Sequence, residues 1–239
     1  MRSASLSPRP TAGGEGKFKK FRSVLWRYRH SALLLYMLIY FPWFNYLEDT
    51  VTKHFHVIHM RLDDMIPFME IFVIPYMLWF AYVAAAIAFF LIVNKNDYYK
   101  LCLFLFTGMT LFLIISTVYP NGHLLRPLVF ERDNIFVDLV KLVYASDTPT
   151  NLFPSIHVYN SIGVNIAVQR SAQLQNKKGI RLGSHILCVL IVLSTMFIKQ
   201  HSVFDVLCGI VLSVVMYALV YDKAPARAGQ TIAEKLRRV

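Results

Sequence analysis

The chain has 239 residues, of which 56% are hydrophobic and 16% are charged. A soluble domain carries about 25% charged residues, so this composition disfavours a water-soluble globular protein. The net charge of +11 would suit a nucleic-acid-binding protein, but such a footprint clusters on a soluble face, and we expect no nucleic-acid partner.

The N-terminus divides into two segments before the first apolar stretch. Residues 1–16 are rich in Ser, Pro and Gly, which predicts a disordered segment. Residues 17–30 alternate basic and aromatic side chains, a pattern typical of a helix lying on an anionic membrane surface. An ordinary basic flank of the first membrane span is the alternative.

Six charge-free stretches follow, and they predict the fold class. They cover residues 30–47, 71–94, 101–125, 148–169, 182–198 and 206–221. A membrane-spanning helix needs about 17–25 predominantly apolar residues. We therefore predict an all-α integral membrane protein, in which residues 31–221 form a six-transmembrane-helix bundle and residues 222–239 a basic cytoplasmic tail. The fourth stretch is polar, so it is expected inside the bundle, away from lipid.

The longest connection, residues 118–154, contains a further helical pattern. Ile135, Leu139, Leu142 and Val143 recur at helical spacing with charged residues between them. The pattern predicts a short amphipathic helix at the outer face of the membrane.

The basic residues of the connections predict the orientation of the bundle. Nineteen of the 25 lysines and arginines fall on the side of both termini, and six on the other side. Because cytoplasmic loops are enriched in these residues, both termini are predicted to be cytoplasmic. The cell membrane is the expected location, and the oligomeric state stays open.

Residues suited to catalysis gather in three connections that this count places outside. In "HSVFD", His201 and Asp205 are four residues apart and would share one face of a helix. The carboxylate could accept the proton on Nδ1 and leave Nε2 free as a nucleophile or base. An interfacial histidine beside a solvated aspartate is the structural alternative.

The sequence "PSIH" contributes a second histidine. Ser155 as N-cap would leave free backbone amides at a helix start, where anions bind. His157 could then donate a proton to a leaving oxygen. A plain cap followed by a buried histidine is the alternative.

Arg126, in "YPNGHLLRP", has the fork of donors that suits a phosphate, although a snorkelling arginine at a span end is equally compatible. Together these groups suit phosphoryl transfer without a metal or other cofactor. His54, His56 and His59 are interpreted as interfacial loop residues, because the spacing and fourth ligand of a zinc site are unsupported.

These three motifs resemble the type 2 phosphatidic acid phosphatase superfamily, whose pattern is K-x6-R-P, P-S-G-H and S-R-x5-H-x3-D. The resemblance covers roughly residues 71–221 and implies a six-helix fold. It also implies that His201 attacks phosphorus, that Asp205 orients it and that His157 protonates the leaving alcohol. Arg126 and Ser155 would hold the phosphate.

The departures from this pattern concern the cations that bind phosphate. Tyr119 stands where the family has Lys, Thr195 where it has Arg, and Ile156 where it has Gly. Tyr119 could donate a hydrogen bond to phosphate. Lys199 could replace one cation, and an ordinary basic residue at a span end is the alternative. A monoester carries close to two negative charges and a diester one, so these losses affect monoesters more. The sequences of the second and third motifs resemble those of the inositol phosphorylceramide synthase and sphingomyelin synthase branch.

The leading interpretation is a membrane-embedded lipid phosphatase that acts on a lipid phosphate through a phosphohistidine. The alternatives are a phosphodiester head-group transferase, a phospholipase C-like enzyme and a catalytically weak lipid-binding protein. A transporter fits less well, because inverted repeats and charges in the middle of a span are not found.

Overall fold

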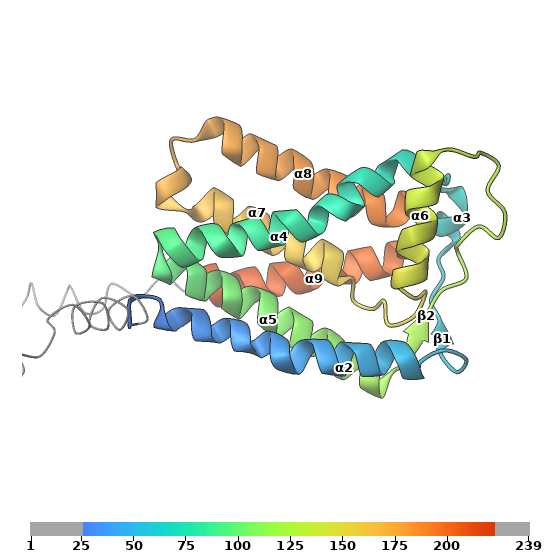
Figure 1. Ribbon diagram of the computed structural model, residues 1–239, viewed down its shortest axis with the longest axis horizontal. Helices are drawn as coiled ribbons and strands as arrows, with labels where there is room; N and C mark the ends of the chain where they lie inside the picture. The colour runs from blue at the N-terminus through green and yellow to red at the C-terminus, as the bar shows by residue number, and fades with distance from the viewer. Residues whose placement is uncertain (1–25, 223–239) are drawn as a thin grey trace, which may run out of the picture.

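The structure is a computed structural model that describes residues 26–222 (Figure 1). The predicted disordered segment 1–16, most of the interfacial segment 17–30 and nearly all of the tail 222–239 lie outside the described residues. The helices and strands are, in chain order, η1 (Arg29–Tyr36), α2 (Met37–Thr50), β1 (His56–Val57), α3 (Arg61–Met65), η2 (Glu70–Phe72), α4 (Val73–Val93), α5 (Lys95–Val118), β2 (Asn121–Gly122), α6 (Ile135–Ser146), α7 (Ile156–Arg170), η3 (Ala172–Leu174), α8 (Lys178–Phe197), α9 (Val203–Tyr217) and η4 (Ala218–Asp222).

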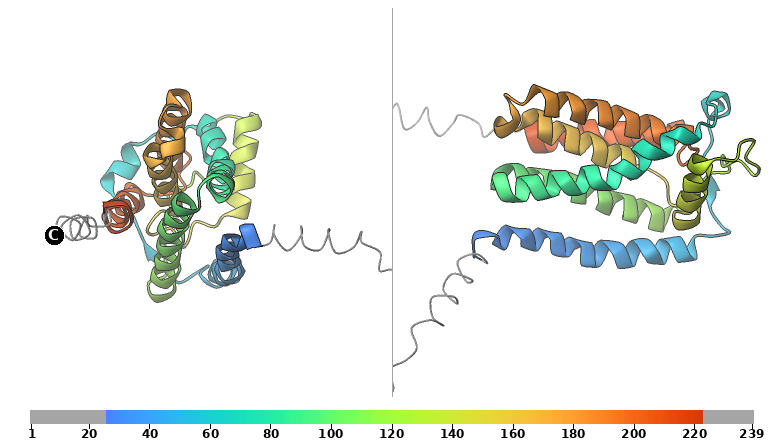
Figure 2. Two further views of the ribbon diagram at one scale, coloured as in Figure 1. Left: turned by 90° about the vertical axis from the view of Figure 1, so that its left-hand side faces the viewer. Right: turned by 45° about the horizontal axis from the view of Figure 1, so that its top comes forward.

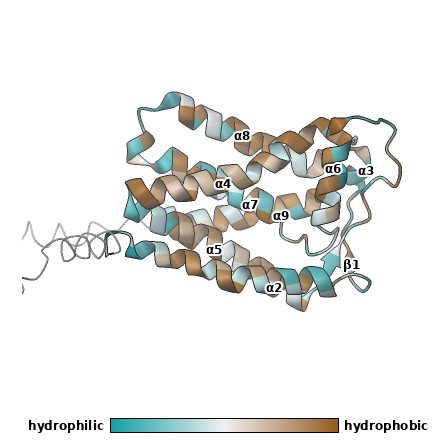
Figure 3. Cartoon of the chain, viewed as in Figure 1, coloured by the Kyte–Doolittle hydropathy of each residue, from teal (hydrophilic) through white to brown (hydrophobic). Residues whose placement is uncertain are grey.

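The long helices α2, α4, α5, α7, α8 and α9 run lengthwise along one bundle, with α2 at its edge beside α5 (Figures 1 and 2). Within the described residues, four stretches are long and apolar enough to cross a membrane: Glu70–Val93, Lys95–Val118, Lys178–Phe197 and Val203–Tyr221. Apolar residues cover much of the long helices (Figure 3). The mostly helical fold, with helices long and apolar enough to span a membrane, is confirmed, and the count of six spans stays a prediction.

Helix α7 is the most enclosed of the long helices. It packs against α4, α5, α8 and α9, and polar residues such as Asn160 and Ser161 are buried in it. Its 15 residues are shorter and more polar than the four candidate spans. The expectation that the polar fourth stretch lies inside the bundle is therefore confirmed.

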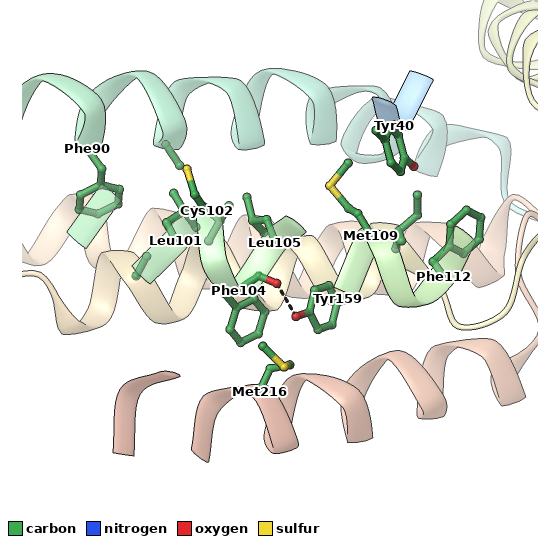
Figure 4. Close-up of a cluster of buried hydrophobic side chains, with 14 of the residues drawn as sticks. Tyr40, Phe90, Leu101, Cys102, Phe104, Leu105, Met109, Phe112, Tyr159 and Met216 are labelled. Atoms are coloured by element: carbon green, nitrogen blue, oxygen red, sulfur yellow. Dashed lines mark hydrogen bonds between the residues drawn. The ribbon is translucent and has the colours of Figure 1, made fainter. Parts of the chain in front are cut away.

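An aromatic core holds α5 against α7 (Figure 4). The Tyr159 ring stacks on Phe104, with 4.7 Å between ring centroids, and its hydroxyl donates to the Phe104 carbonyl at 2.6 Å. A Cβ at Gly108 would lie 2.0 Å from Tyr159 Cε1. Glycine at this position is what allows the two helices to approach so closely.

The connections fall at the two ends of the bundle as the charge count assumed. Both ends of the described chain lie at one end, and α3, α6, β1 and β2 lie at the other (Figure 1). The helix predicted around residues 135–143 is confirmed as α6, which lies across this second end (Figure 1). Which end faces the cytoplasm, and the outer-face position of α6, stay predictions.

A small network of backbone hydrogen bonds joins three of the connections at this second end. β1 pairs in parallel with β2, in the register His56↔Asn121 and Val57↔Gly122. Gly122 also forms an antiparallel bridge with Thr150. The network holds the loop after α2, the loop after α5 and the loop before α7 side by side, and the last of these leads into "PSIH".

Candidate active site

The start of α7 is fixed by Ser155. Its hydroxyl accepts a hydrogen bond from the Val158 N–H at 3.4 Å, so Ser155 is the N-cap that the sequence indicates. The Ser155 N–H donates to the Asp205 carbonyl at 3.2 Å. This bond joins the start of α7 to the first turn of α9 and so brings two motifs together.

Asp205 closes the first turn of α9 and also faces His201. Its Oδ2 accepts the Ser202 N–H at 3.0 Å, which completes a capping box with Ser202. The same oxygen lies 3.6 Å from Nδ1 of His201. Among residues 26–222, Oδ1 of Asp205 and Nδ1 of His201 have no hydrogen-bond partner. A small rotation of the carboxylate would satisfy both atoms.

The two histidines from different motifs meet directly. Nδ1 of His157 lies 3.3 Å from Nε2 of His201, and both side chains are buried. One of these nitrogens must carry the proton. Because the Asp205 carboxylate faces Nδ1 of His201, a proton is favoured there. His157 Nδ1–H then donates to a bare His201 Nε2.

The His157 ring is held by two aromatic residues of α4. Its centroid lies 4.7 Å from that of Tyr76 and 4.3 Å from that of Trp79. His157 and Asp147 line one wall of a cavity of 310 Å³ between α2, α4, α6 and α7. Most of the other side chains around this cavity are apolar or aromatic. His157, the partner of His201, thus borders a mostly apolar space.

Arg126 lies near this site, and its guanidinium is already engaged. Nη1 donates to the Tyr144 carbonyl at 3.2 Å, and Nη2 donates to the Asp147 carbonyl at 2.6 Å and to Oε1 of Gln200. The guanidinium also stacks over the Tyr144 ring at 4.3 Å. Its Nε has no partner among residues 26–222. Arg126 thus joins α6 to the residue before His201.

Two residues of the site were missed by the sequence analysis, Gln200 and Asp147. Gln200 Nε2 lies within 3.4 Å of both the Tyr76 hydroxyl and Oδ2 of Asp147. The Tyr76 hydroxyl donates to the same carboxylate oxygen at 2.8 Å. Burial raises the pKa of the Asp147 carboxyl. An acidic residue just before a polar, charge-free stretch was the available signal for Asp147; Gln200 gave none.

Lys199 and Tyr119, the two substitutes predicted for the missing cations, are engaged elsewhere. The Lys199 ammonium donates to the carbonyls of Asp63 and Ile66, at 2.7 and 2.6 Å. The Tyr119 ring stacks on His56, with 4.3 Å between centroids, and is 44% exposed. Their predicted roles in phosphate binding are untested. In this arrangement Lys199 fastens the loop after α2 to the turn before α9.

His123 supports the same turn from the loop after α5. Its Nε2–H donates to the Gln200 carbonyl at 2.9 Å, and its Nδ1 accepts the Leu125 N–H at 3.1 Å. Burial lowers the pKa of His123 to about 4, so its imidazole is neutral in this position. Both ring nitrogens are used, which leaves His123 a supporting role beside His201.

Gly209 allows α9 to lie against the start of α7, and its replacement tests that contact. A Cβ at Gly209 would lie 2.9 Å from the Ser155 carbonyl oxygen. We expect Gly209→Ala to separate the two helices and to lower both turnover and the melting temperature. Gly183→Ala is the control, because nothing lies within 4 Å of a Cβ there. Equal melting temperatures and equal rates for the two variants would contradict this packing.

The described residues offer no obvious metal site. Among residues 26–222, no group of three or more His, Cys, Asp or Glu side chains is placed to hold a metal ion. In the loop histidines 54, 56 and 59, His59 pairs with Asp64 at 2.9 Å, and His56 stacks on Tyr119.

Residues 26–222 thus form a helical bundle in which four stretches are long and apolar enough to cross a membrane. At one end of the bundle, two buried histidines contact each other and an aspartate lies beside one of them. The family model of the PAP2 superfamily matches residues 133–228. That segment of the chain therefore carries the sequence features of this superfamily, whose members are phosphatases or phosphotransferases.

The matched segment contains "PSIH" and "HSVFD" and begins after Tyr119 and Arg126. No curated protein and no solved structure matches the chain. The similarity to the inositol phosphorylceramide synthase and sphingomyelin synthase branch stays a prediction.

Proposed function

We propose that the protein is a membrane-embedded lipid phosphatase that acts on a lipid phosphate through a phosphohistidine. The observation that carries this proposal is the buried contact of 3.3 Å between Nδ1 of His157 and Nε2 of His201, with Asp205 behind His201. His201 can serve as a nucleophile that Asp205 orients, and His157 can serve as an acid close to the attacking Nε2 of His201.

In the first step, Nε2 of His201 attacks phosphorus. An N–P bond forms and the P–O bond to the lipid alcohol breaks. The electron pair goes to the leaving oxygen, which takes the proton from Nδ1 of His157 in its imidazolium form and leaves that ring neutral. The positive charge that develops on the His201 ring is stabilised by Asp205, whose carboxylate faces its Nδ1–H.

In the second step, His157 removes a proton from water and the water oxygen attacks phosphorus. The N–P bond breaks, its electron pair returns to Nε2 of His201, and phosphate leaves. An acceptor alcohol in place of water would give a transferase. The chemistry of His157 and His201 is the same in both reactions.

The site must open before either step. An attacking atom lies about 3–3.5 Å from its target, and an acid about 2.6–3.2 Å from the oxygen that it protonates. A phosphoryl group therefore cannot lie between nitrogens that are 3.3 Å apart. We infer that the substrate separates the two rings, and that Ser155, the amides at the start of α7 and Arg126 then hold the phosphate. Roles for Tyr119 and Lys199 require their side chains to turn toward it.

Transfer of a phosphodiester head group, or its phospholipase C-like hydrolysis, is the second candidate. It is favoured by the scarcity of free positive charge, because the Lys199 ammonium is held by the Asp63 and Ile66 carbonyls. A catalytically weak lipid-binding protein is the third candidate. For each candidate we infer an integral protein of the cell membrane with cytoplasmic termini, six spans and the site at the outer face.

The test is a substrate panel with purified full-length protein. Orthophosphate release from phosphatidic acid or from a polyprenyl pyrophosphate, inhibited by vanadate, supports the phosphatase. Diacylglycerol release from a phospholipid diester supports the second candidate. If vanadate does not bind and no substrate is turned over, both enzymatic proposals are wrong.

A further inference from the structure

A carboxylate lies where a phosphate-binding site would be expected to collect positive charge. Asp147 and His157 line the same cavity, and the backbone carbonyl of Asp147 accepts from Arg126. Among residues 26–222, no cation lies within ion-pair distance of the Asp147 carboxylate, and its donors are the neutral side chains of Tyr76 and Gln200. Charges withdrawn from water are normally paired, so a half-buried carboxylate without a cation beside it is unusual.

The hydrogen bonds of Asp147 leave part of its carboxylate free. Within the described residues, both donors reach Oδ2 and none reaches Oδ1. The residue is neither fully buried nor exposed, and it lines the same cavity as His157. A negative oxygen is thus available to a group that enters beside the histidine pair.

The positive charge available at the site is correspondingly small. Arg126 contributes one positive charge, whereas Asp147 and Asp205 each carry a carboxylate. The Lys199 ammonium is bound to the carbonyls of Asp63 and Ile66. The titratable groups that act on Asp147 or share its cavity are Tyr40 and Glu48 of α2, Tyr76 of α4, His157 of α7, Arg126 and His201.

We propose that Asp147 is a specificity residue that makes the site select phosphate groups with a single negative charge. The proposal rests on the phosphoryl-transfer function proposed above and narrows its substrate to phosphodiesters and to monoesters in their singly ionised form. A dianionic monoester brings a second negative charge toward the Asp147 carboxylate, and this repulsion is strong in a partly desolvated site. A diester avoids it.

The test compares two substrates with the same lipid alcohol, phosphatidic acid and phosphatidylmethanol with identical acyl chains. Both release diacylglycerol, so one readout serves for both, and their ratio of kcat/KM cancels the titration of the histidines. The second ionisation of a phosphate monoester lies near pH 6. In the wild type, the ratio of monoester to diester should fall as pH rises from 5 to 8. Protonation of Asp147 at low pH acts in the same direction.

Three variants identify the residue responsible. Asp147→Asn should raise the ratio of monoester to diester at pH 8 by about tenfold and flatten its pH dependence. Asp147→Glu keeps the charge and should keep the discrimination. Asp138→Asn is the matched control, because Asp138 is an exposed residue of the same helix α6 and should leave the ratio unchanged.

The outcomes separate this proposal from the proposed function. If the wild type releases diacylglycerol from neither substrate, the proposed function is wrong and this inference with it. If both are turned over but Asp147→Asn alters them by the same factor, this inference alone is wrong. If Asp147→Asn does not fold, the wild-type ratio decides: a value that stays constant between pH 5 and 8 overturns the proposal.

Discussion

His201→Ala should lower turnover by at least about 10⁴-fold while the protein still inserts and folds. The reason is that Nε2 of His201 is the atom proposed to bond to phosphorus, and no other side chain among residues 26–222 contacts Nδ1 of His157 in its place. The measurement is product release from the best substrate of the panel, together with an alkaline quench after labelled substrate is added, because a phosphohistidine survives alkali and is lost in acid. The wild type should carry an acid-labile phosphoryl label, and the variant none.

Two further variants sharpen this prediction. His185→Ala is the control, because His185 is an exposed histidine of α8 that contacts Asn165, and it should keep the wild-type rate. His157→Ala should slow the cleavage of an alkyl phosphate ester much more than the cleavage of a nitrophenyl phosphate ester. The reason is that nitrophenolate leaves without a proton. A phosphoryl label on His201→Ala would place the nucleophile elsewhere.

Arg126→Lys should lower kcat/KM by about 10²–10³-fold, although the charge is kept. The guanidinium joins the Tyr144 and Asp147 carbonyls to the Gln200 side chain, and a lysine has no planar fork to reach all three. The turn that positions His201 would then lose this connection to α6 and keep only the bond from the Tyr144 hydroxyl to the Ile198 carbonyl. Rates with both lipid classes, measured on protein of verified melting temperature, provide the check.

Arg132→Lys is the matched control for Arg126. The Arg132 side chain is 62% exposed and pairs with the buried Glu70 at 3.1 Å, and a lysine at this position keeps the charge of that pair. It should retain wild-type rates. Wild-type kcat/KM in Arg126→Lys would mean that the guanidinium neither positions this turn nor contacts phosphate.

The parts of the fold that could be predicted are those encoded over a single stretch of chain. The apolar runs gave the long helices because a span is recorded as consecutive apolar residues. The amphipathic spacing from Ile135 gave α6. The position of the polar α7 inside the bundle followed from the cost of facing lipid with such residues.

The candidate site was predictable to the same extent. The four-residue spacing of His201 and Asp205 places both on one side of a turn, and Ser155 begins α7 as its motif indicated. Lys199 and Tyr119 show the limit of such reasoning. Spacing specifies where a residue sits along the chain, but the partners that hold their side chains, Asp63 and His56, come from a distant loop.

Asp147 and Gln200 show the same limit, because they belong to the site and were not predicted from the sequence. No local pattern marks either residue as part of a site. They become so because α4, α6 and the turn before α9 meet, which lets the Tyr76 hydroxyl and Gln200 share one carboxylate oxygen. Such convergence of distant segments is a property of the folded chain, and one sequence does not record it.

In the proposed phosphatase, the direct contact between His157 and His201 would keep Nε2 of His201 from reacting until a substrate separates the rings. While Nδ1 of one ring occupies Nε2 of the other, the reactive lone pair is unavailable to stray water or to small electrophiles. Separating the two rings costs free energy. A ligand that also fills the adjoining 310 Å³ cavity can offset this cost by burying apolar surface. The reactivity of the proposed site would thereby depend on the apolar chains of the lipid substrate, which lie several bonds away from the phosphorus.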